Sequence, residues 1–451
     1  MTLTVLILYL LFLSFIAFRS FQKINNYADF FVARKKGSFR TVTGSLLATI
    51  LGGSAVIGAI DAGKNMGWAT SWFMLCAAIG LFALLPFTKR ISQLGRYTLP
   101  DLLEDLYGRK TKTIASFMIP LAWLGIVAAQ LIASARILQS FTGLNYVWGV
   151  LISAFVFTAY TIAGGQLSVL KTDFTQAILI ITGLLVIAFF SFSQLPMEKF
   201  RQFPLNLPFN AHFRPTDLFI LLLTYSSTFT AGPDIYSRIF CAANEKTAKR
   251  AVLSTALTLI PIALIIGYLS VVGALLPGTN EHGASLVEIA QTILPLWVIP
   301  LIVIALLSAV LSSADTTILS ASIIVCDLIS KSKFDHNTLK TTRIIILLFG
   351  ILSAIIAINF TSIIEMLLIA LTVYSGAFIL PVLFGLAKVK IRSEFVSAAI
   401  IIGGLVALTG KLMSFTNWGY WSNWIIVSAF AFNAILLLAG KIKTKEKIFS
   451  N

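Results

Sequence analysis

Charged residues are scarce in this chain: of its 451 residues, 12% are Asp, Glu, Lys or Arg, and 58% are hydrophobic. Soluble proteins carry about 25% charged residues, so a soluble domain of this composition would expose a large apolar surface. Runs of about 20 apolar residues recur along the whole sequence, and each is long enough to cross a bilayer. We therefore expect a single all-α integral membrane domain over residues 1–451.

Cysteine and histidine are also rare, with three residues of each. Cys76, Cys241 and Cys326 lie far apart in or beside apolar runs and form no CxxC pair, so neither a disulfide framework nor a zinc site is indicated. The three His residues fall in separate loops, which argues against a metal cluster. The catalytic motifs GxSxG, HExxH and GxxxxGK[ST] do not occur. We therefore expect no enzyme and no organic cofactor.

Thirteen apolar runs are candidate membrane-spanning helices. No Lys or Arg precedes the first run, and no small-residue cleavage motif ends it, so we expect a retained span and not a signal peptide. The runs cover residues 3–18, 41–62, 68–87, 113–135, 145–163, 174–195, 216–232, 251–276, 295–327, 342–358, 362–387, 395–414 and 421–440.

The Lys and Arg residues are divided unequally between alternate loops. Of the 34 in the chain, 28 fall in one set of loops and six in the other. Cytoplasmic loops are the Lys/Arg-rich ones, so we expect the N-terminus outside and the C-terminus in the cytoplasm of a bacterial inner (plasma) membrane. Topology thus accounts for the net charge of +16, and nucleic acid is not an expected partner. The six are Lys64, Arg136, Lys199, Arg201, Arg214 and Lys411.

Two spans carry helix-breaking residues. Gly52 and Gly53 lie at the centre of the second span, and Gly232 and Pro233 end the apolar run of the seventh. Backbone groups freed by glycine or proline are costly in lipid unless they meet polar partners. The two spans are five apart and so run in opposite directions, a pattern that indicates a transporter site at mid-membrane. The alternative is that the paired glycines only allow close helix packing.

The ninth span bears a polar stripe. Ala309, Ser312, Ser313 and Thr316 are spaced i, i+3, i+4 and i+7, which puts them on one helix face, and Asp315 lies beside them. A carboxylate within a membrane is costly and indicates a function. The alternative for the hydroxyls is a hydrogen bond to the carbonyl of their own i−4 residue.

The break in the second span and the polar stripe are predicted at similar depth. At 1.5 Å per residue, Ala48 to Leu51 lie about 10–15 Å from the inner face, and Ala309 to Ser313 lie in the same half of the membrane. Hydroxyl, carboxylate and freed carbonyl oxygens are the ligands that a hard cation such as Na⁺ prefers. The two segments therefore predict a cation site between them.

Three segments resemble conserved blocks of the sodium:solute symporter family. Tyr160–Gly165 followed by Lys171–Gln176 is similar to the family's YTxxGG…TDxxQ block. Gly232–Arg238 followed by Ala248–Arg250 is similar to the signature after the second broken helix. The Ser-rich ninth span is the third segment, and the resemblance extends over about residues 1–440.

The resemblance implies about thirteen helices around a five-plus-five inverted repeat of the leucine-transporter type. The expected division is an extra N-terminal helix in residues 1–22, a first repeat in 40–195, a second repeat in 215–388 and C-terminal helices in 393–441.

The resemblance also implies where cations bind. The main sodium site of the family falls here on Ala48, Leu51, Ala309, Ser312 and Ser313. A second cation site of some members falls on Asp173, with Ser312, Asp315 and Thr316 facing it. Asp315 departs from the pattern, because related members carry a hydroxyl there. Three roles are open for it: strengthening the second site, carrying a proton, or pairing with Lys171.

The expected substrate pocket is small and mostly apolar. The proline-transporter carboxylate in the first broken helix is replaced by Ile50. Arg136 ends the fourth span on its outer side and suits bidentate recognition of a carboxylate, although a snorkelling arginine is the alternative. We expect an amino acid or a monocarboxylate as the solute. The predicted lining is Gly53, Ser54, Trp72, Phe73, Arg136 and Tyr374.

These features together predict a symporter that imports a small organic solute with sodium by alternating access. Sodium is then the coupling ion, and membrane lipid is the other expected contact. A proton-coupled symporter on the same fold is the first rival, with Asp315 in its favour. A membrane sensor derived from the fold is the second, although Lys441–Asn451 is too short to hold a signalling module.

Overall fold

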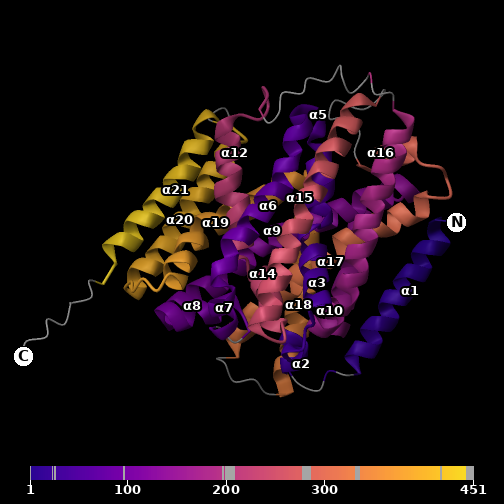
Figure 1. The fold of residues 1–451 in the computed structure, drawn as a ribbon. Helices are drawn as coiled ribbons and strands as arrows, with labels where there is room; N and C mark the ends of the chain where they lie inside the picture. Colours follow the sequence, from indigo (N-terminus) through magenta and orange to yellow (C-terminus); the bar gives the residue numbers. More distant parts are fainter. Residues whose placement is uncertain are drawn as a thin grey trace, which may run out of the picture.

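The computed structural model describes residues 2–22, 24, 27–94, 97–195, 198, 209–276, 286–330, 336–416 and 419–442. Helices dominate these residues, with only isolated bridges as extended pairing, so the all-α prediction is confirmed. In the same residues, ten helices are long and apolar enough to cross a membrane. Figure 1 shows a bundle of tilted helices, with α20 and α21 at one flank and α1 at the other.

The helices follow one another with short connections. Their bounds are α1 Thr2–Phe21, α2 Tyr27–Val32, η1 Ala33–Lys35, α3 Phe39–Ile50, α4 Gly53–Asp61, α5 Gly63–Met66, η2 Gly67–Thr70, α6 Ser71–Leu84, η3 Leu85–Phe87, α7 Thr88–Gln93, α8 Leu99–Tyr107, α9 Arg109–Thr142 and α10 Tyr146–Gln194. The second half comprises α12 Pro215–Leu221, η4 Leu222–Ser226, α13 Ser227–Ala231, α14 Pro233–Cys241, α15 Glu245–Leu275, α16 Leu286–Ile293, α17 Ile299–Ile329, α18 His336–Asn359, α19 Ile363–Leu386, α20 Ser393–Met413 and α21 Gly419–Ala439.

The continuous helix α10 contains two of the predicted spans. Gly165 interrupts it with φ 52° and ψ −160°, a left-handed conformation that favours glycine. The Tyr160 hydroxyl lies 2.7 Å from the Thr172 hydroxyl, whereas twelve residues of straight helix extend about 18 Å. The chain therefore turns sharply at Gly165, between the predicted spans 145–163 and 174–195.

The other differences from the predicted spans have local causes. Span 216–232 is divided into α12, the π-helical turn η4 and α13, while the first span lies in α1, of which only Ile7–Phe21 is apolar and described throughout the membrane scan. Neither segment enters the ten long helices. The count of thirteen and the inverted repeat stay predictions.

Two segments form the centre of the bundle. Inside the protein, 94% of the apolar stretch of α3 and α4 is buried and 83% of that of α17, against 33% for α21. Helix α17 packs against α3, α9 and α10, and α1 covers α10 and α17 from outside. The segments that carry the predicted cation ligands are therefore those most removed from lipid.

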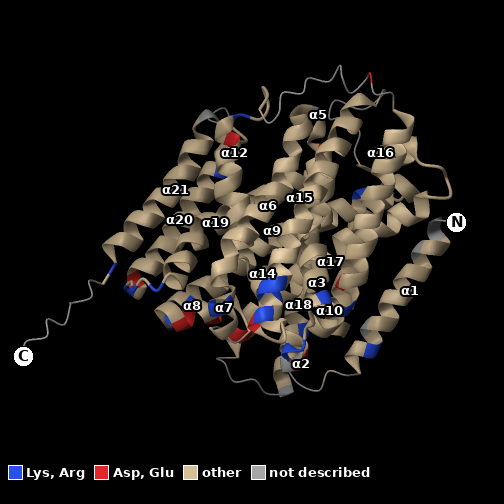
Figure 2. Ribbon diagram, in the orientation of Figure 1, with Lys and Arg blue, Asp and Glu red and all other residues tan. Residues whose placement is uncertain are grey.

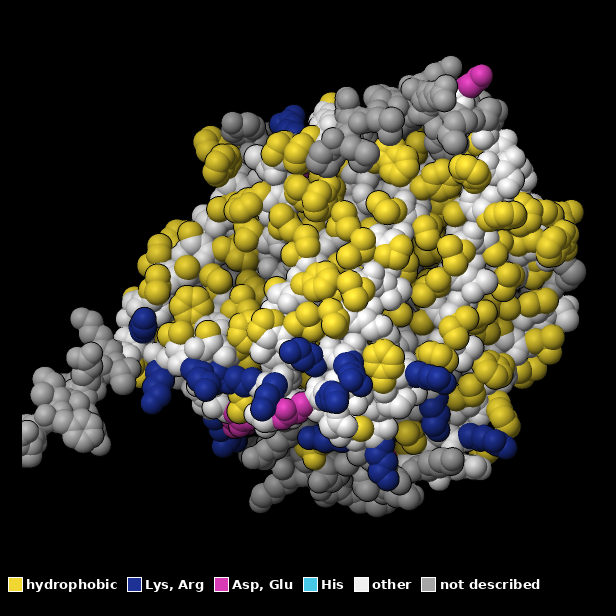
Figure 3. Space-filling model, viewed as in Figure 1, with side chains coloured by type: hydrophobic (Ala, Val, Ile, Leu, Met, Phe, Trp, Pro, Cys, Tyr) yellow, Lys and Arg dark blue, Asp and Glu magenta, His cyan; other side chains and the backbone are white. Residues whose placement is uncertain are grey.

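Lys and Arg gather at one end of the bundle. Figure 2 places most of them near α2, α7 and α8, and Figure 3 shows them below a broad belt of hydrophobic side chains. A charged rim beside an apolar belt is the surface expected of a membrane protein with one Lys/Arg-rich side. Which side faces the cytoplasm stays a prediction, and Lys199 and Arg201 lie outside the described residues.

A buried lysine holds three acidic side chains together at the cation-rich end. The Lys112 ammonium on α9 lies 2.8 Å from carboxylates of Asp101 and Glu104 on α8 and 2.8 Å from Asp327 on α17. The Lys112 side chain is only 7% exposed. The cluster therefore fixes α8 against the inner ends of α9 and α17.

We expect Lys112→Gln to lower the Tm of the detergent-solubilised protein strongly, because three carboxylates lose the cation they share. Removing one partner of a buried ion pair costs about 3–5 kcal/mol. Lys89→Gln is the control, since Lys89 pairs with Glu245 at 3.8 Å while 71% exposed, and such surface pairs contribute about 0–1 kcal/mol. Equal losses of Tm in the two variants would contradict the role given to Lys112.

Candidate functional site

The first broken helix is interrupted between α3 and α4. Leu51 takes φ −80° and ψ 32°, and Gly52 takes φ −59° and ψ 153°. The Leu51 amide donates to the Leu47 carbonyl at 2.8 Å. Because the last four carbonyls of a helix have no intrahelical donor, those from Ala48 onward need partners from elsewhere.

The polar stripe of α17 supplies those partners. The Ser312 hydroxyl donates to the Ala48 carbonyl at 2.9 Å, and the Ser313 hydroxyl donates to the Thr49 carbonyl at 2.8 Å. Ser312 Oγ also lies 3.2 Å from the Ala309 carbonyl. The structure thus brings Ala48, Ala309, Ser312 and Ser313 together, with Leu51 fully buried one turn further along.

Close packing at the break requires glycine. A Cβ atom on Gly52 would overlap the Ser313 hydroxyl and would lie 3.1 Å from Gln130 Nε2. The Gln130 amide on α9 accepts from the Ser54 amide at 3.1 Å and donates to the Ser54 hydroxyl at 2.7 Å. Gln130 therefore caps the start of α4, a role that its place in an apolar run would have suggested had intramembrane amides been considered.

The predicted second cation site contains an arginine. The Arg238 guanidinium on α14 donates to Asp173 at 3.3 Å, to the Ser45 hydroxyl at 3.0 Å and to the Thr316 hydroxyl. Ser45 in turn donates to the same Asp173 oxygen. Arg238 and Asp173 are both fully buried. Asp173 and Thr316 thus converge as predicted, but a positive side chain lies between them.

Asp315 lies at the edge of this cluster. One of its oxygens is 3.4 Å from the Thr316 hydroxyl. Within the described part of the chain, the other Asp315 oxygen and Asp173 Oδ1 are buried without a hydrogen-bond partner. Lys171 is exposed and donates to the Ser20 hydroxyl at 3.2 Å, so this conformation does not form the Lys171–Asp315 pair that was one of three open roles.

The predicted solute pocket is closely packed in this conformation. Phe73 is 3% and Tyr374 1% exposed. The Phe73 ring packs edge-on against Tyr225 at 5.5 Å, and the Tyr374 hydroxyl donates to the Ala231 carbonyl. Gly53 contacts Val310 closely, and Trp72 is half-buried on α6. These elements, α4, α6, α13 and α19, pack on one another beside the break at Gly52.

Arg136 is the pocket candidate that the structure places differently. Its guanidinium donates to the Thr361 carbonyl at 2.6 Å and lies 3.8 Å from the Asp61 carboxylate. Asp61 ends α4, and Thr361 precedes α19. Arg136 therefore joins three segments six positions beyond Gln130, toward the other end of α9.

The second break lies at Gly232. Gly232 is extended (φ −71°, ψ 134°), and Pro233 starts α14. The carbonyls before the break accept from tyrosines: Ala231 from Tyr374, and Thr230 from Tyr236 at 3.0 Å. In Figure 1, α12 and α14 descend toward the cation-rich end, whereas α3 rises from it. The two broken helices therefore run in opposite directions.

Comparison with known proteins follows the same pattern. Residues 30–403 match the model of the sodium:solute symporter family. The sodium/proline symporter of Haemophilus influenzae is 23% identical over 450 residues, which cover 92% of this chain and 89% of that protein. The high affinity choline transporter 1 of Homo sapiens is 23% identical over 68% of this chain, and the match spans 57% of that relative.

Solved structures agree on the architecture. A Na⁺-coupled sialic acid symporter, in a substrate-bound outward-open state, aligns with a TM-score of 0.80 at 16% identity over 98% of this chain and 99% of that chain. A nucleobase-cation-symport-1 family transporter aligns with a TM-score of 0.62 at 13% identity, over 91% of this chain and 93% of that one. Sodium/proline symporter 2 of Staphylococcus saprophyticus is 24% identical, but the match spans only 48% of its length.

We expect Gly52→Ala to destabilise the protein, because the added methyl group displaces the Ser313 hydroxyl from the break. Overpacking of this kind costs about 1–3 kcal/mol. Gly58→Ala on the same helix is the matched control, since its Cβ would meet no atom closer than 3.5 Å. Thermal unfolding in detergent measures both variants, and an unchanged Tm for Gly52→Ala would show that the break tolerates a side chain.

Proposed function

Since the chain belongs to the sodium:solute symporter family, we propose that it imports a small organic solute together with sodium by alternating access. Its relatives are transporters, and transporters of this kind are not enzymes. The many apolar helices make it a multi-pass membrane protein. We further propose a bacterial plasma membrane as its location, with the cation-rich end in the cytoplasm and the N-terminus outside.

One observation supports the proposal most directly: the hydroxyls of α17 reach the carbonyls freed at the first break. We assign the main sodium site to Ala48, Leu51, Ala309, Ser312 and Ser313. A sodium ion here takes lone pairs of the same oxygens that now share hydroxyl protons, because it binds hydroxyl and carbonyl oxygens alike. The site then joins a broken helix to a straight one.

That junction gives sodium a way to drive transport. A ligand shifts a conformational equilibrium only by its differential affinity for the two states. Sodium held between α3 and α17 favours the state in which these helices approach and complete the solute pocket. One charge crossing at 100 mV supplies about 2.3 kcal/mol, equivalent to about 50-fold accumulation of solute.

The second cation site has a different status in our proposal. Arg238 already occupies the oxygens of Asp173 and Thr316, and a guanidinium is permanently charged. We propose that it acts as a fixed cation, so that one sodium ion accompanies each solute molecule. A second sodium ion would have to displace Arg238 from the carboxylate.

The solute itself is proposed from chemistry. The starts of α4 and α14 converge on the region of the breaks, and helix N-termini favour negatively charged groups. An amino acid or a monocarboxylate fits these ends and the apolar rings of Phe73 and Tyr374. In this conformation Arg136 is held by Thr361 and Asp61, so a role in binding carboxylate requires it to exchange partners.

We expect Ser312→Ala and Ser313→Ala each to weaken sodium stimulation of uptake at least tenfold, since each removes one sodium ligand and one partner of a freed carbonyl. Ser320→Ala, a buried serine two turns further along α17, is the control and should retain stimulation. Proteoliposomes with imposed sodium gradients measure uptake, using the solutes found by sodium-dependent thermal shifts. Unchanged sodium dependence in both variants would reject the site, and uptake driven by a pH gradient without sodium would favour proton coupling.

We expect Arg238→Gln to steepen the dependence of uptake on sodium, from a Hill coefficient near one to one near two. Loss of the guanidinium leaves the Asp173 carboxylate open to a second sodium ion. Arg238→Lys keeps a positive charge and should keep the coefficient near one. A wild-type coefficient near two would contradict the fixed-cation role, and Arg238→Gln/Asp173→Asn tests it if the single variant does not fold.

A further inference from the structure

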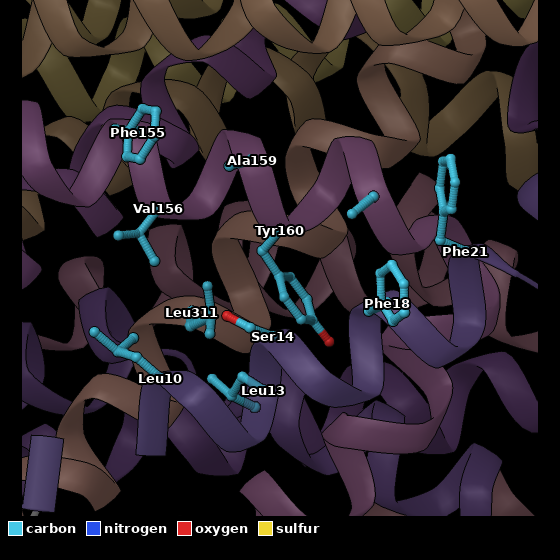
Figure 4. Close-up of a pocket in the computed structure, with 11 residues that line it drawn as sticks. Leu10, Leu13, Ser14, Phe18, Phe21, Phe155, Val156, Ala159, Tyr160 and Leu311 are labelled. Carbon is cyan, nitrogen blue, oxygen red and sulfur yellow. The ribbon is translucent and has the colours of Figure 1, made fainter. Parts of the chain in front are cut away.

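Two cavities open on the membrane-facing side of α10. The first, called here the α1 cavity, has a volume of about 570 Å³ and lies between α1, α10 and α17, with Leu10, Phe21 and Leu311 on its wall. The second, the α18 cavity, has about 360 Å³ and lies between α10 and α18. Figure 4 shows the side chains of α1 and α10 facing each other across the α1 cavity.

The cavities meet on the surface of α10. Phe155 and Ala159 belong to the walls of both, and Phe155 is 74% exposed. Each cavity also extends along its helix pair: the α18 cavity includes Leu347 near the start of α18 and Ile358 near its end. The result is a pair of parallel apolar channels separated by one ridge.

Basic side chains lie at the end of the channels near the start of α18. The Arg343 guanidinium lies 4.9 Å from the centre of the Phe21 ring, and Phe21 lines the α1 cavity. Arg343 is also one turn before Leu347, which lines the α18 cavity. Lys171, which donates to Ser20, is exposed next to the end of α1. Both channels therefore lead to positive charge.

Arg343 has donor capacity to spare. Within the described part of the chain, its Nε atom is buried and has no hydrogen-bond partner. A buried donor of this kind costs free energy until an acceptor reaches it. Phosphate oxygens match the planar guanidinium in geometry and charge.

We propose that this site binds one diacyl phospholipid with an anionic headgroup. Its two acyl chains occupy the α1 and α18 cavities on either side of Phe155, and its phosphate contacts Arg343 near Lys171. Basic pockets between membrane helices on the cytoplasmic side bind anionic headgroups in this way. The apolar walls at membrane depth select acyl chains, since each buried CH₂ group contributes to binding.

Occupancy of the site bears on the cation cluster. Tyr160 lines the α1 cavity, and its hydroxyl contacts Thr172 and Ser168 at 2.7 and 2.9 Å. Thr172 immediately precedes Asp173. The lipid therefore packs against the segment that positions the partner of Arg238.

The test compares lipids on the purified full-length protein in detergent, by Tm and by native mass spectrometry. We expect phosphatidylglycerol to raise the Tm and to remain bound as one molecule, phosphatidylcholine to act more weakly, and inorganic phosphate to have no effect. Arg343→Gln should weaken phosphatidylglycerol binding about fivefold, the effect of one basic residue near a membrane surface. Lys411→Gln is the control, because Lys411 also lies over an aromatic ring, that of Phe415 at 5.7 Å, but outside the site.

Cavity-filling variants test the acyl channels separately. Ala159→Phe and Ser14→Phe place a ring inside the α1 cavity and should abolish binding of both lipids while Arg343 is intact. Equal affinity for the two lipids, or equal phosphatidylglycerol affinity in the wild type and Arg343→Gln, would overturn the proposed headgroup contact. Unchanged binding in both cavity variants would overturn the placement of the chains, and a response to inorganic phosphate alone would reduce the site to an anion site.

Discussion

The structure depends on satisfying backbone carbonyls that a broken helix exposes inside a membrane. An unsatisfied carbonyl in lipid costs several kcal/mol, so a break persists only where a neighbouring element supplies donors. Ser312 and Ser313 supply them at the first break, while Tyr374 and Tyr236 supply them at the second. The first set is made of small hydroxyls that also bind cations, and the second of aromatic hydroxyls next to the predicted solute pocket. This chemical difference separates the ion from the solute within one architecture.

Two buried basic residues complement these breaks. Lys112 joins α8 to the inner ends of α9 and α17, and Arg238 joins α14 to α3, α10 and α17. Both sets of contacts link segments distant in sequence, and neither cation is exposed to solvent. A change between outward-open and inward-open states that separates these helices must break such pairs and hydrate the charges. The inner half of the protein is therefore held by charge, whereas its centre is held by hydroxyl–carbonyl contacts.

Much of the fold was predictable, because helix period and helix breakers act locally. Apolar runs predicted the helices, and Gly52 and Gly232 predicted the interruptions, since both effects depend on neighbouring residues. The turn at Gly165 was anticipated only as a gap between two spans. The convergence of Ala48 with Ser312 followed from depth and from a family resemblance. Arg238, Gln130 and Ser45 were missed, because which side chain fills a polar cluster depends on contacts across 76 to 193 positions that no local pattern records.

Tyr9 illustrates a further cost of long-range polar contacts. Its hydroxyl is buried against Ser308, 299 positions later, and within 3.3 Å of Gln176. At about 5–20 residues synthesised per second, α1 leaves the ribosome about 15–60 s before α17 is made. During that interval the phenol faces hydrocarbon, water or the insertion machinery instead of its final neighbour. Biogenesis of this protein therefore includes a delay set by translation speed, after which the first helix docks onto the last-made member of its binding groove.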